Sequence, residues 1–306
     1  MLRFMSWRFL RAQVTMLFVL VVAFLTVRLS GEPFDTMFPE GLTQETAQAL
    51  RHRWNLDLPI WEQFTLYLGK MLTGDFGRSL FTHEPVWQMY AERMPATLAV
   101  GSLALIIAIS LGIPIGALSA LRRGAVTERM LMGVAFLGYA VPHFVFGIGL
   151  ILLFGYYLRL LPASGLSSPQ HYILPVLTLA IPMVAGIARF MRAAMLDTIG
   201  QPYVMTAASK GLGNGRIARR HVLRNAMVPL VTVLGLEIAG LINGSVFVEA
   251  VFSLPGVGRV LVSSVENRDF TVLQFGVVAY AGLVVLINLV IDLLYTLIDP
   301  RVRVGG

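Results

Sequence analysis

Three glycines, Gly211, Gly213 and Gly215, lie at a spacing that could cradle a phosphate group. The phosphate-binding loop of nucleotide hydrolases also needs a Lys and a Ser or Thr directly after its last glycine. Here Arg216 follows the last glycine, and Lys210 lies before the first. A dinucleotide-binding fingerprint would need a preceding strand within a βαβ unit, and the flanking residues favour helices instead. We therefore expect the chain to bind no nucleotide itself.

Side chains that could hold a metal ion or act as acids and bases are scattered along the chain. The absence of cysteine excludes disulfides and thiolate metal sites. His143 and Glu237 alone do not supply a nucleophile with its base. We expect neither a metal site nor catalytic residues. The histidines show no ligand spacing such as two histidines separated by three residues; they are His52, His83, His143, His171 and His221.

The composition indicates a membrane protein. Of the 306 residues, 56% are hydrophobic and 13% are charged, and the mean hydropathy is +0.73. Soluble domains contain about 25% charged residues, and a soluble chain could not bury this much apolar surface. This excludes disorder and a soluble enzyme, and it makes the lipid bilayer an expected partner. The net charge of +7 is explained by basic cytoplasmic loops, so we expect no nucleic-acid partner.

The apolar residues are gathered into runs long enough to cross a bilayer, which needs about 20 residues per helix. We therefore predict an all-α polytopic membrane protein with six transmembrane helices. The first run also fits a cleaved signal peptide, but no A-x-A cleavage pattern follows it, which favours a retained anchor. The six windows are Ala12–Val27, Thr97–Ala120, Met130–Leu158, Tyr172–Ala188, Met227–Val248 and Phe270–Ile298.

Lys and Arg residues set the expected orientation. With the first residues placed inside the cell, the inner segments hold 15 Lys and Arg in 68 residues, whereas the outer segments hold 9 in 102. Both termini are therefore expected in the cytoplasm. The inner segments are 1–11, 121–129, 189–228 and 299–306, and the outer segments are 28–96, 159–171 and 251–270.

The outer segment before the second window is long enough to contain helices of its own. Thr43 can cap a helix that runs to about Trp54, and Pro59 lies at the start of a second helix. Glu84 opens an expected third helix that ends near Pro95. We expect a small extracytoplasmic helical insertion between spans one and two. The predicted units are 1–30 (N-terminal segment and first span), 31–96 (helical insertion) and 97–306 (five-helix core).

The inner segment 189–228 is too long for a simple connector. Residues 203–210 favour a short helix that ends at the three glycines, and an Arg-rich helix follows. A helical hairpin that projects from a membrane domain is suited to docking on another protein. The alternative is a solvated basic loop that only enforces the orientation.

Four stretches, taken in order, carry a resemblance to a known family. They are Gly74-Asp75-Phe76-Gly77-Arg78-Ser79; Thr206-Ala207-Ala208-Ser209-Lys210-Gly211-Leu212 with the later Arg220–Pro229; Val248–Arg259; and Asn267–Phe270 with Gln274 and Asp299-Pro300-Arg301. With them the chain resembles, over nearly its whole length, the permease subunits of bacterial ABC importers for dipeptides, oligopeptides, glutathione or nickel. It is most similar to the B-type subunit of that group.

The resemblance implies a type I ABC importer permease of the bacterial inner membrane that forms half of a translocation pore. It implies as partners a second homologous permease, two cytoplasmic ATPases that bind ATP and Mg²⁺, and an extracytoplasmic substrate-binding protein. No cofactor is implied on this chain. The substrate stays open, with peptide the commonest assignment. An ion-driven secondary transporter is the alternative, but no inverted repeat with interrupted helices is visible.

The resemblance also assigns the hairpin as the coupling helix that fits a cleft on the ATPase. Gly211 matches the motif glycine, and Met205 stands where the general motif has Glu. The small side chains of the hairpin would let it approach the ATPase closely. The implied coupling residues are Met205, Thr206, Ala207, Ala208, Ser209, Lys210, Gly211, Leu212, Arg219, Arg220, His221 and Arg224.

Polar side chains within the windows are costly in hydrocarbon and therefore candidates for function. Glu237, Asn243, Tyr139 and His143 are candidates for the pathway or a subunit interface. The alternative is that they bridge helices within one subunit. That alternative is favoured near the inner end of the last window, where one helical face contains Asn288, Asp292, Tyr295 and Asp299.

Overall fold

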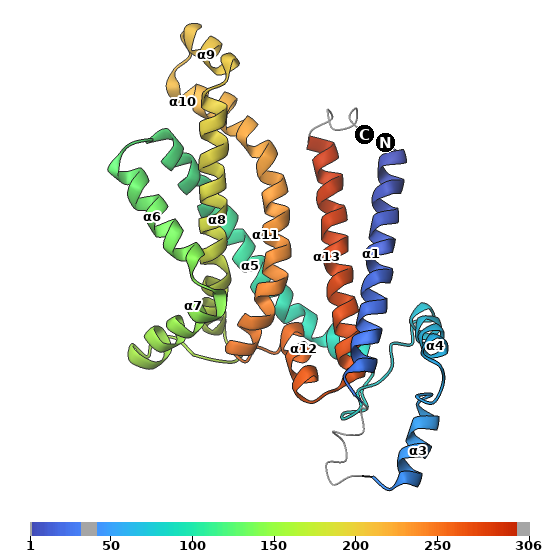
Figure 1. The fold of residues 1–306 in the computed structure, drawn as a ribbon. Coiled ribbons are helices and arrows are strands. Elements are labelled where there is room, and N and C mark those ends of the chain that lie inside the picture. Colours follow the sequence, from blue (N-terminus) through green and yellow to red (C-terminus); the bar gives the residue numbers. More distant parts are fainter. Residues whose placement is uncertain (1, 32–41, 299–306) are drawn as a thin grey trace.

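The computed structural model describes residues 2–31 and 42–298, and these residues form helices joined by short loops (Figure 1). Five helices or helical runs are long and apolar enough to cross a membrane. A sixth crossing is counted if a sharply bent helix pair is one span. The predicted all-α fold is confirmed. The five are α1 (Leu2–Leu29), α5 (Val86–Leu121), α8 (Ile173–Ile199), the run ending in α11 (Arg224–Val251), and α13 (Phe270–Ile298).

The predicted third span is not one straight helix. It consists of α6 (Val126–Ala140) and α7 (His143–Leu150), which is extended by a π-helix, Ile151–Tyr157. The two parts are bent by 102°. Pro142 explains the break, because proline lacks an N–H and drives the preceding residue out of helical geometry. Val141 accordingly adopts an extended conformation, with φ −91° and ψ 127°.

The predicted third helix of the outer insertion is wrong as a separate element. It is the first part of α5, which starts at Val86 and passes through Pro95 without ending. A proline in a membrane helix kinks it and does not necessarily end it, because neighbouring groups satisfy the freed carbonyl. The first two predicted helices are confirmed as α3 (Gln44–Arg53), with Thr43 as its cap, and α4 (Ile60–Leu72).

The inner segment is shorter than predicted, because both flanking spans extend beyond the apolar windows. Helix α8 continues to Ile199, and α10 (Asn214–Ile217) leads through a π-helix, Ala218–Leu223, directly into α11. Only α9 (Pro202–Ser209) and its flanking turns project from these helices. The hairpin therefore rests on two continuous helical stems.

Helix α8 is the centre of the packing. In its apolar window 61% of the residues are buried, against 28% or less in the four other candidate spans. It packs on α5, α6 and α11. Gly112 on α5 lets α5 and α8 approach closely. A Cβ at this position would lie only 2.8 Å from Cβ of Ile187 on α8, which is too close for two carbon atoms. Helix α1 instead packs on α13, beside the rest of the bundle (Figure 1).

One helix in the outer part was missed. Residues 251–270 were assigned only as an outer segment, and they contain α12 (Val257–Glu266), which packs on α11, α13 and α5. Figure 1 shows α9 at the same end of the bundle as the start of α1 and the end of α13. Helices α3 and α4 lie at the opposite end.

Candidate functional site

Helix α9 lies at the tip of the molecule and turns one face inward (Figure 1). Val204 and Ala207 are buried in a cluster with Ile217 and Val222, which anchors the hairpin to its own stems. The opposite face is open, and Met205 at its centre is 62% exposed. This arrangement presents a short helix with small, polar and large apolar side chains to any protein that docks there.

The structure divides the predicted coupling residues into two groups. Ala207 points into the chain's own core, and Leu212 and His221 are half-buried. These three side chains pack within the hairpin itself. Of the small residues expected to let an ATPase approach closely, only Ala208 and Gly211 are exposed. The exposed members are Met205, Thr206, Ala208, Ser209, Lys210, Gly211, Arg219, Arg220 and Arg224.

Gly211 ends α9 through its backbone conformation. Its φ is +79°, in the left-handed region that favours glycine. Its N–H donates to the carbonyl of Ala208 at 2.9 Å, which satisfies one of the last carbonyls of the helix. A Cβ at this position would meet no atom within 4 Å, so the requirement is conformational and not steric.

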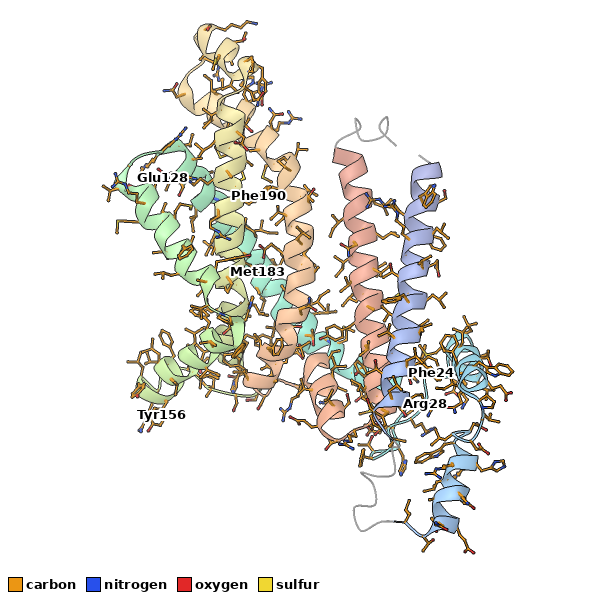
Figure 2. All side chains as sticks on the ribbon, in the orientation of Figure 1. Phe24, Arg28, Glu128, Tyr156, Met183 and Phe190 are labelled. Atoms are coloured by element: carbon orange, nitrogen blue, oxygen red, sulfur yellow. The ribbon has the colours of Figure 1, made fainter. Side chains whose placement is uncertain are left out.

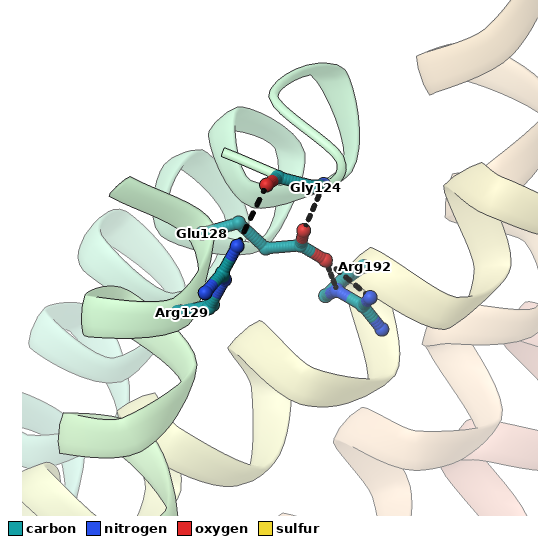
Figure 3. A network of polar contacts seen from close by, with 4 residues as sticks. All are labelled: Gly124, Glu128, Arg129 and Arg192. Carbon is teal, nitrogen blue, oxygen red and sulfur yellow. Dashed lines mark hydrogen bonds and ion pairs between the residues drawn. The ribbon is translucent and has the colours of Figure 1, made fainter. Parts of the chain in front are cut away.

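An ion pair braces the same end of the bundle (Figure 3). Nε of Arg192 on α8 donates to Oε1 of Glu128 on α6 at 2.7 Å, and a second guanidinium nitrogen donates to the same oxygen. The N–H of Gly124 donates to the other carboxylate oxygen. The turn between α5 and α6 is thereby fixed to the stem of the hairpin. In the sequence Glu128 is an acid within the basic inner segment 121–129, and no local pattern identifies its partner.

A second buried carboxylate joins three helices at the other end. Glu249 at the end of α11 is only 2% exposed. It accepts hydrogen bonds from the hydroxyl of Thr97 at 2.6 Å and from the N–H of Gly258 at 2.7 Å. A Cβ at Gly256 would overlap this carboxylate, so the glycines after it make room for the contact. In the sequence, this buried contact is indicated only by the order of Glu249 and the later Pro255-Gly256.

The predicted pathway residues separate into three places. Glu237 is half-buried on α11 and faces Gly186 of α8. Arg189, also on α8, places its guanidinium 3.9 Å from the ring centre of Tyr139. Glu237 and Tyr139 therefore both lie against α8, at Gly186 and at Arg189, a residue that the prediction left out.

The other two candidates lie apart from this group. His143 packs against Gly244, where a Cβ would lie 3.5 Å from its ring. Asn243 is exposed on the surface of α11. Of the polar face predicted near the end of the last span, Asn288 is exposed. The side chains of Asp292 and Tyr295, and residues 299–301, lie outside the described residues. Within the described part of the chain, no three His, Asp or Glu side chains are grouped to hold a metal ion.

Comparisons with known proteins give the family. Residues 112–304 match the family described as "Binding-protein-dependent transport system inner membrane component", and residues 1–101 match its N-terminal counterpart. The chain belongs to this family. It is a permease subunit of an ABC importer and a multi-pass protein of the bacterial inner membrane, as predicted.

Curated relatives cover nearly the whole permease. A probable peptide ABC transporter permease of Sinorhizobium fredii is 38% identical over 92% of this chain and 93% of the relative. The dipeptide permease DppB of Escherichia coli K12 is 35% identical over 90% of this chain and 91% of its own. The glutathione permease GsiC of Shigella flexneri is 38% identical over 99% of both chains.

Solved structures share the fold of the permease. A chain of the MetNI methionine ABC transporter superposes with a TM-score of 0.61 at 20% identity. The match covers 71% of this chain and 99% of that one. At this identity the likeness concerns the fold alone. It confirms the predicted type I importer architecture for the part of the permease that it covers.

The stretches that carried the resemblance meet in the folded permease. Ser79, in the first stretch, donates its hydroxyl to Asp269, in the last, at 2.5 Å. The N–H of Leu80 donates to the same carboxylate oxygen at 3.1 Å. The outer insertion is thereby tied to the start of α13. This contact joins residues that are 190 positions apart in the sequence.

Proposed function

We propose that this permease forms half of a pore that imports short peptides, driven by ATP hydrolysis on separate cytoplasmic chains. The observation that carries the proposal is the near-complete match to peptide and glutathione permeases. Glutathione is itself a tripeptide, so both names describe one chemical class. Nickel, which the resemblance left open, stays an untested prediction.

The partners follow from the same proposal. A second homologous permease completes the pore, two ATPases bind ATP and Mg²⁺ at the cytoplasmic end, and an extracytoplasmic binding protein delivers the peptide. Hydrolysis belongs to the ATPases, and this chain performs no catalysis. The proposed orientation places the start of α1 and α9 in the cytoplasm. The excess of Lys and Arg in the inner segments supports it.

The coupling step rests on α9. Its exposed face enters the ATPase, and movement passes through the stems of α8 and α11 into the membrane. The Glu128–Arg192 ion pair supports this role, because a stiff connection is needed to transmit a small displacement. Lys210, Arg219 and Arg224 supply positive charge for acidic groups around the ATPase cleft.

The test is uptake by the complete transporter in proteoliposomes. ATP-dependent uptake of a labelled dipeptide or of glutathione is expected with the intact complex. Deletion of residues 206–215 should leave this chain in the membrane but release the ATPases or uncouple them. Normal uptake by that variant would contradict the coupling role. Uptake without ATP by this chain alone would support the ion-driven alternative.

The pathway role of Glu237 has its own experiment. Glu237→Gln keeps the size of the side chain and removes its charge. Reduced peptide uptake at normal assembly is expected if the carboxylate faces the pore. Glu266→Gln is the control, because it makes the same change at an exposed carboxylate at the end of α12. Unchanged uptake by Glu237→Gln would leave the residue with a purely structural role.

A further inference from the structure

Helix α7 and the π-helix that continues it leave the bundle sideways at its outer end (Figure 1). Together they cover residues 143–157, which are termed the transverse helix below. Their axis is bent by 102° from that of α6. No Asp, Glu, Lys or Arg occurs between Met130 and Leu158, so α6 and the transverse helix share one uncharged stretch. Neither the permease function nor the relatives' names say where the transverse helix lies.

Helix α6 by itself falls short of a full crossing. It has 15 residues, which span about 22 Å at about 1.5 Å per residue, whereas the hydrocarbon core is about 30 Å thick. Its inner end lies at the charged turn that Glu128 and Arg192 hold in place. Ala140, the last residue of α6, therefore lies about 8 Å inside the outer boundary of the hydrocarbon.

Contacts with α8 give the same depth independently. A Cβ at Gly147 would lie 3.1 Å from Cγ2 of Thr178, and α8 begins five residues before Thr178, at Ile173. Five residues of α-helix rise about 8 Å. Gly147 therefore lies about that far inside the outer end of α8. The ring of Phe252, directly after α11, would lie 3.1 Å from the same Cβ, so the transverse helix passes across the outer ends of α8 and α11.

One face of the transverse helix is covered by the chain itself. Leu150 and Phe154 pack on the buried cluster that contains Leu174 and Phe252. The N–H of Leu160 donates to the carbonyl of Phe154 at 2.9 Å, so the loop that follows folds back onto the helix. These contacts hold the transverse helix in its sideways position.

The opposite face is apolar and uncovered in this chain. It continues the exposed apolar surface of α6, where Val134 and Leu137 lie in a segment that crosses the bilayer. A helix that is apolar on all sides lies within a protein or within hydrocarbon. The exposed side chains of the transverse helix are Phe144, Val145, Ile148, Leu152 and Leu153.

The far end of the transverse helix has the side chains of a membrane interface. Figure 2 shows Tyr156 at this end, away from the bundle. Its ring meets that of Tyr157 edge to face, with centres 5.3 Å apart, and both rings are exposed. Arg159 follows, and it is also exposed. Tyrosine and arginine are the residues that anchor segments at headgroup level.

The exposed face lacks the pattern of a helix–helix contact. Membrane helices approach one another through small residues four positions apart. Gly155 is turned towards the chain's own Ala163, and Gly147 is likewise covered. Gly149 is exposed, but the residues four positions before and after it are Val145 and Leu153. Lipid chains adapt to such a bulky surface, whereas a partner helix would be kept at a distance.

We propose that the transverse helix lies flat in the outer leaflet, with its exposed face among the lipid acyl chains and its two tyrosines among the headgroups. The depth of about 8 Å lies within the range of about 5–10 Å to which interfacial helices sink. The third crossing of the permease is then made by α6 alone. The bilayer itself supports the outer ends of α8 and α11 through the transverse helix.

The experiment measures depth with nitroxide spin labels on single cysteines, which is clean because the chain has no cysteine of its own. The labelled variants are Phe144→Cys, Ile148→Cys and Leu152→Cys, in the transporter purified with its partners and placed in liposomes. Accessibility to oxygen and to a nickel chelate gives the depth. We expect high oxygen accessibility and one common depth, whereas a crossing helix would change the depth by about 12 Å over eight residues.

Matched control labels lie on α6, at the exposed positions Val126, Met130 and Val134, where depth should change by about 6 Å per four residues. Val145→Cys and Leu153→Cys, on the neighbouring row, replace any label that impairs assembly. A steady change of depth along the transverse helix would overturn the flat orientation. Loss of oxygen accessibility at all its labels would show that another protein covers the face, and would overturn the lipid contact.

Discussion

The carboxylate of Glu237 on α11 lies against Gly186 of α8, so closely that a Cβ at position 186 would overlap its Oε1 atom. A charged side chain in a membrane span thus occupies the space that a missing side chain leaves on the central helix. Neither residue is near the other in sequence. Their contact lies between α8 and α11, the two helices from which the hairpin with α9 projects.

Gly186→Ala is therefore expected to destabilise the fold by about 1–3 kcal/mol, the usual range for overpacking in a filled interior. Thermal unfolding of the purified chain in detergent measures it. Glu237→Ala in the same chain should recover most of the loss, because it removes the overlapping atoms. Gly240→Ala on α11 is the control, since a Cβ there meets no atom within 4 Å. Equal effects at Gly186 and Gly240 would contradict the contact.

Gly211→Val is expected to weaken the end of α9 by about 1–2 kcal/mol, because φ of +79° is strained for a β-branched residue. The chain should still insert in the membrane but retain less ATPase when purified with its partners. Gly211→Asn should be milder, because Asn tolerates this conformation. Gly213→Ala is the control, since φ of Gly213 is −63°. Similar ATPase recovery from Gly211→Val and Gly213→Ala would refute the conformational requirement.

Glu128→Gln is expected to lower stability, since it removes the negative charge from the ion pair that joins α6 to α8. The side chain of Glu128 is 9% exposed and that of Arg192 is 31% exposed. Arg192→Lys should also lose stability, because Lys cannot make the paired contact of the guanidinium. Arg129→Gln is the control, because Arg129 reaches only the Gly124 carbonyl, at 3.5 Å. Chemical unfolding of the three variants measures their losses of stability. A loss in Arg129→Gln equal to that in Glu128→Gln would contradict the role of the ion pair.

The stability of the outer insertion is expected to change with pH through His52 and Asp57, whose Nδ1 and Oδ2 atoms lie 2.8 Å apart. The hydrogen bond to Asp57 raises the pKa of His52 above its ordinary 6.5 and lowers the pKa of Asp57 below 3.8. The contribution of His52 to stability is complete below pH 6.5 and is lost as the pH rises through the raised pKa of His52. The Asp57 contribution is present above 3.8 and is lost as the pH falls through the lowered value.

Between these limits both groups are charged and the contact is strongest. Titration of His52 by nuclear magnetic resonance, with specifically labelled histidine, measures the shift. Asp57→Asn should return the pKa of His52 towards its ordinary value, whereas Glu62→Gln should leave it unchanged. A raised value that survives in Asp57→Asn would show that the contact is not its cause.

The sequence alone determined the approximate place of five spans, because the length of an apolar run is a local property, whereas the predicted third span is a bent helix pair in the structure. It also determined α3 and α9, since Thr43 and Gly211 signal helix ends through interactions within a few residues. The family was evident from four short stretches. The basic hairpin was predicted from the same local signals, and its docking role stays a prediction.

Only the tertiary structure decided which distant residues meet. The Arg192 partner of Glu128, the Thr97 partner of Glu249 and the Asp269 partner of Ser79 lie 64, 152 and 190 residues away. The break at Pro142 and the uninterrupted passage through Pro95 show that the same residue type ends one helix and not another. Local preference is weak compared with packing against neighbouring helices, so packing determines the outcome.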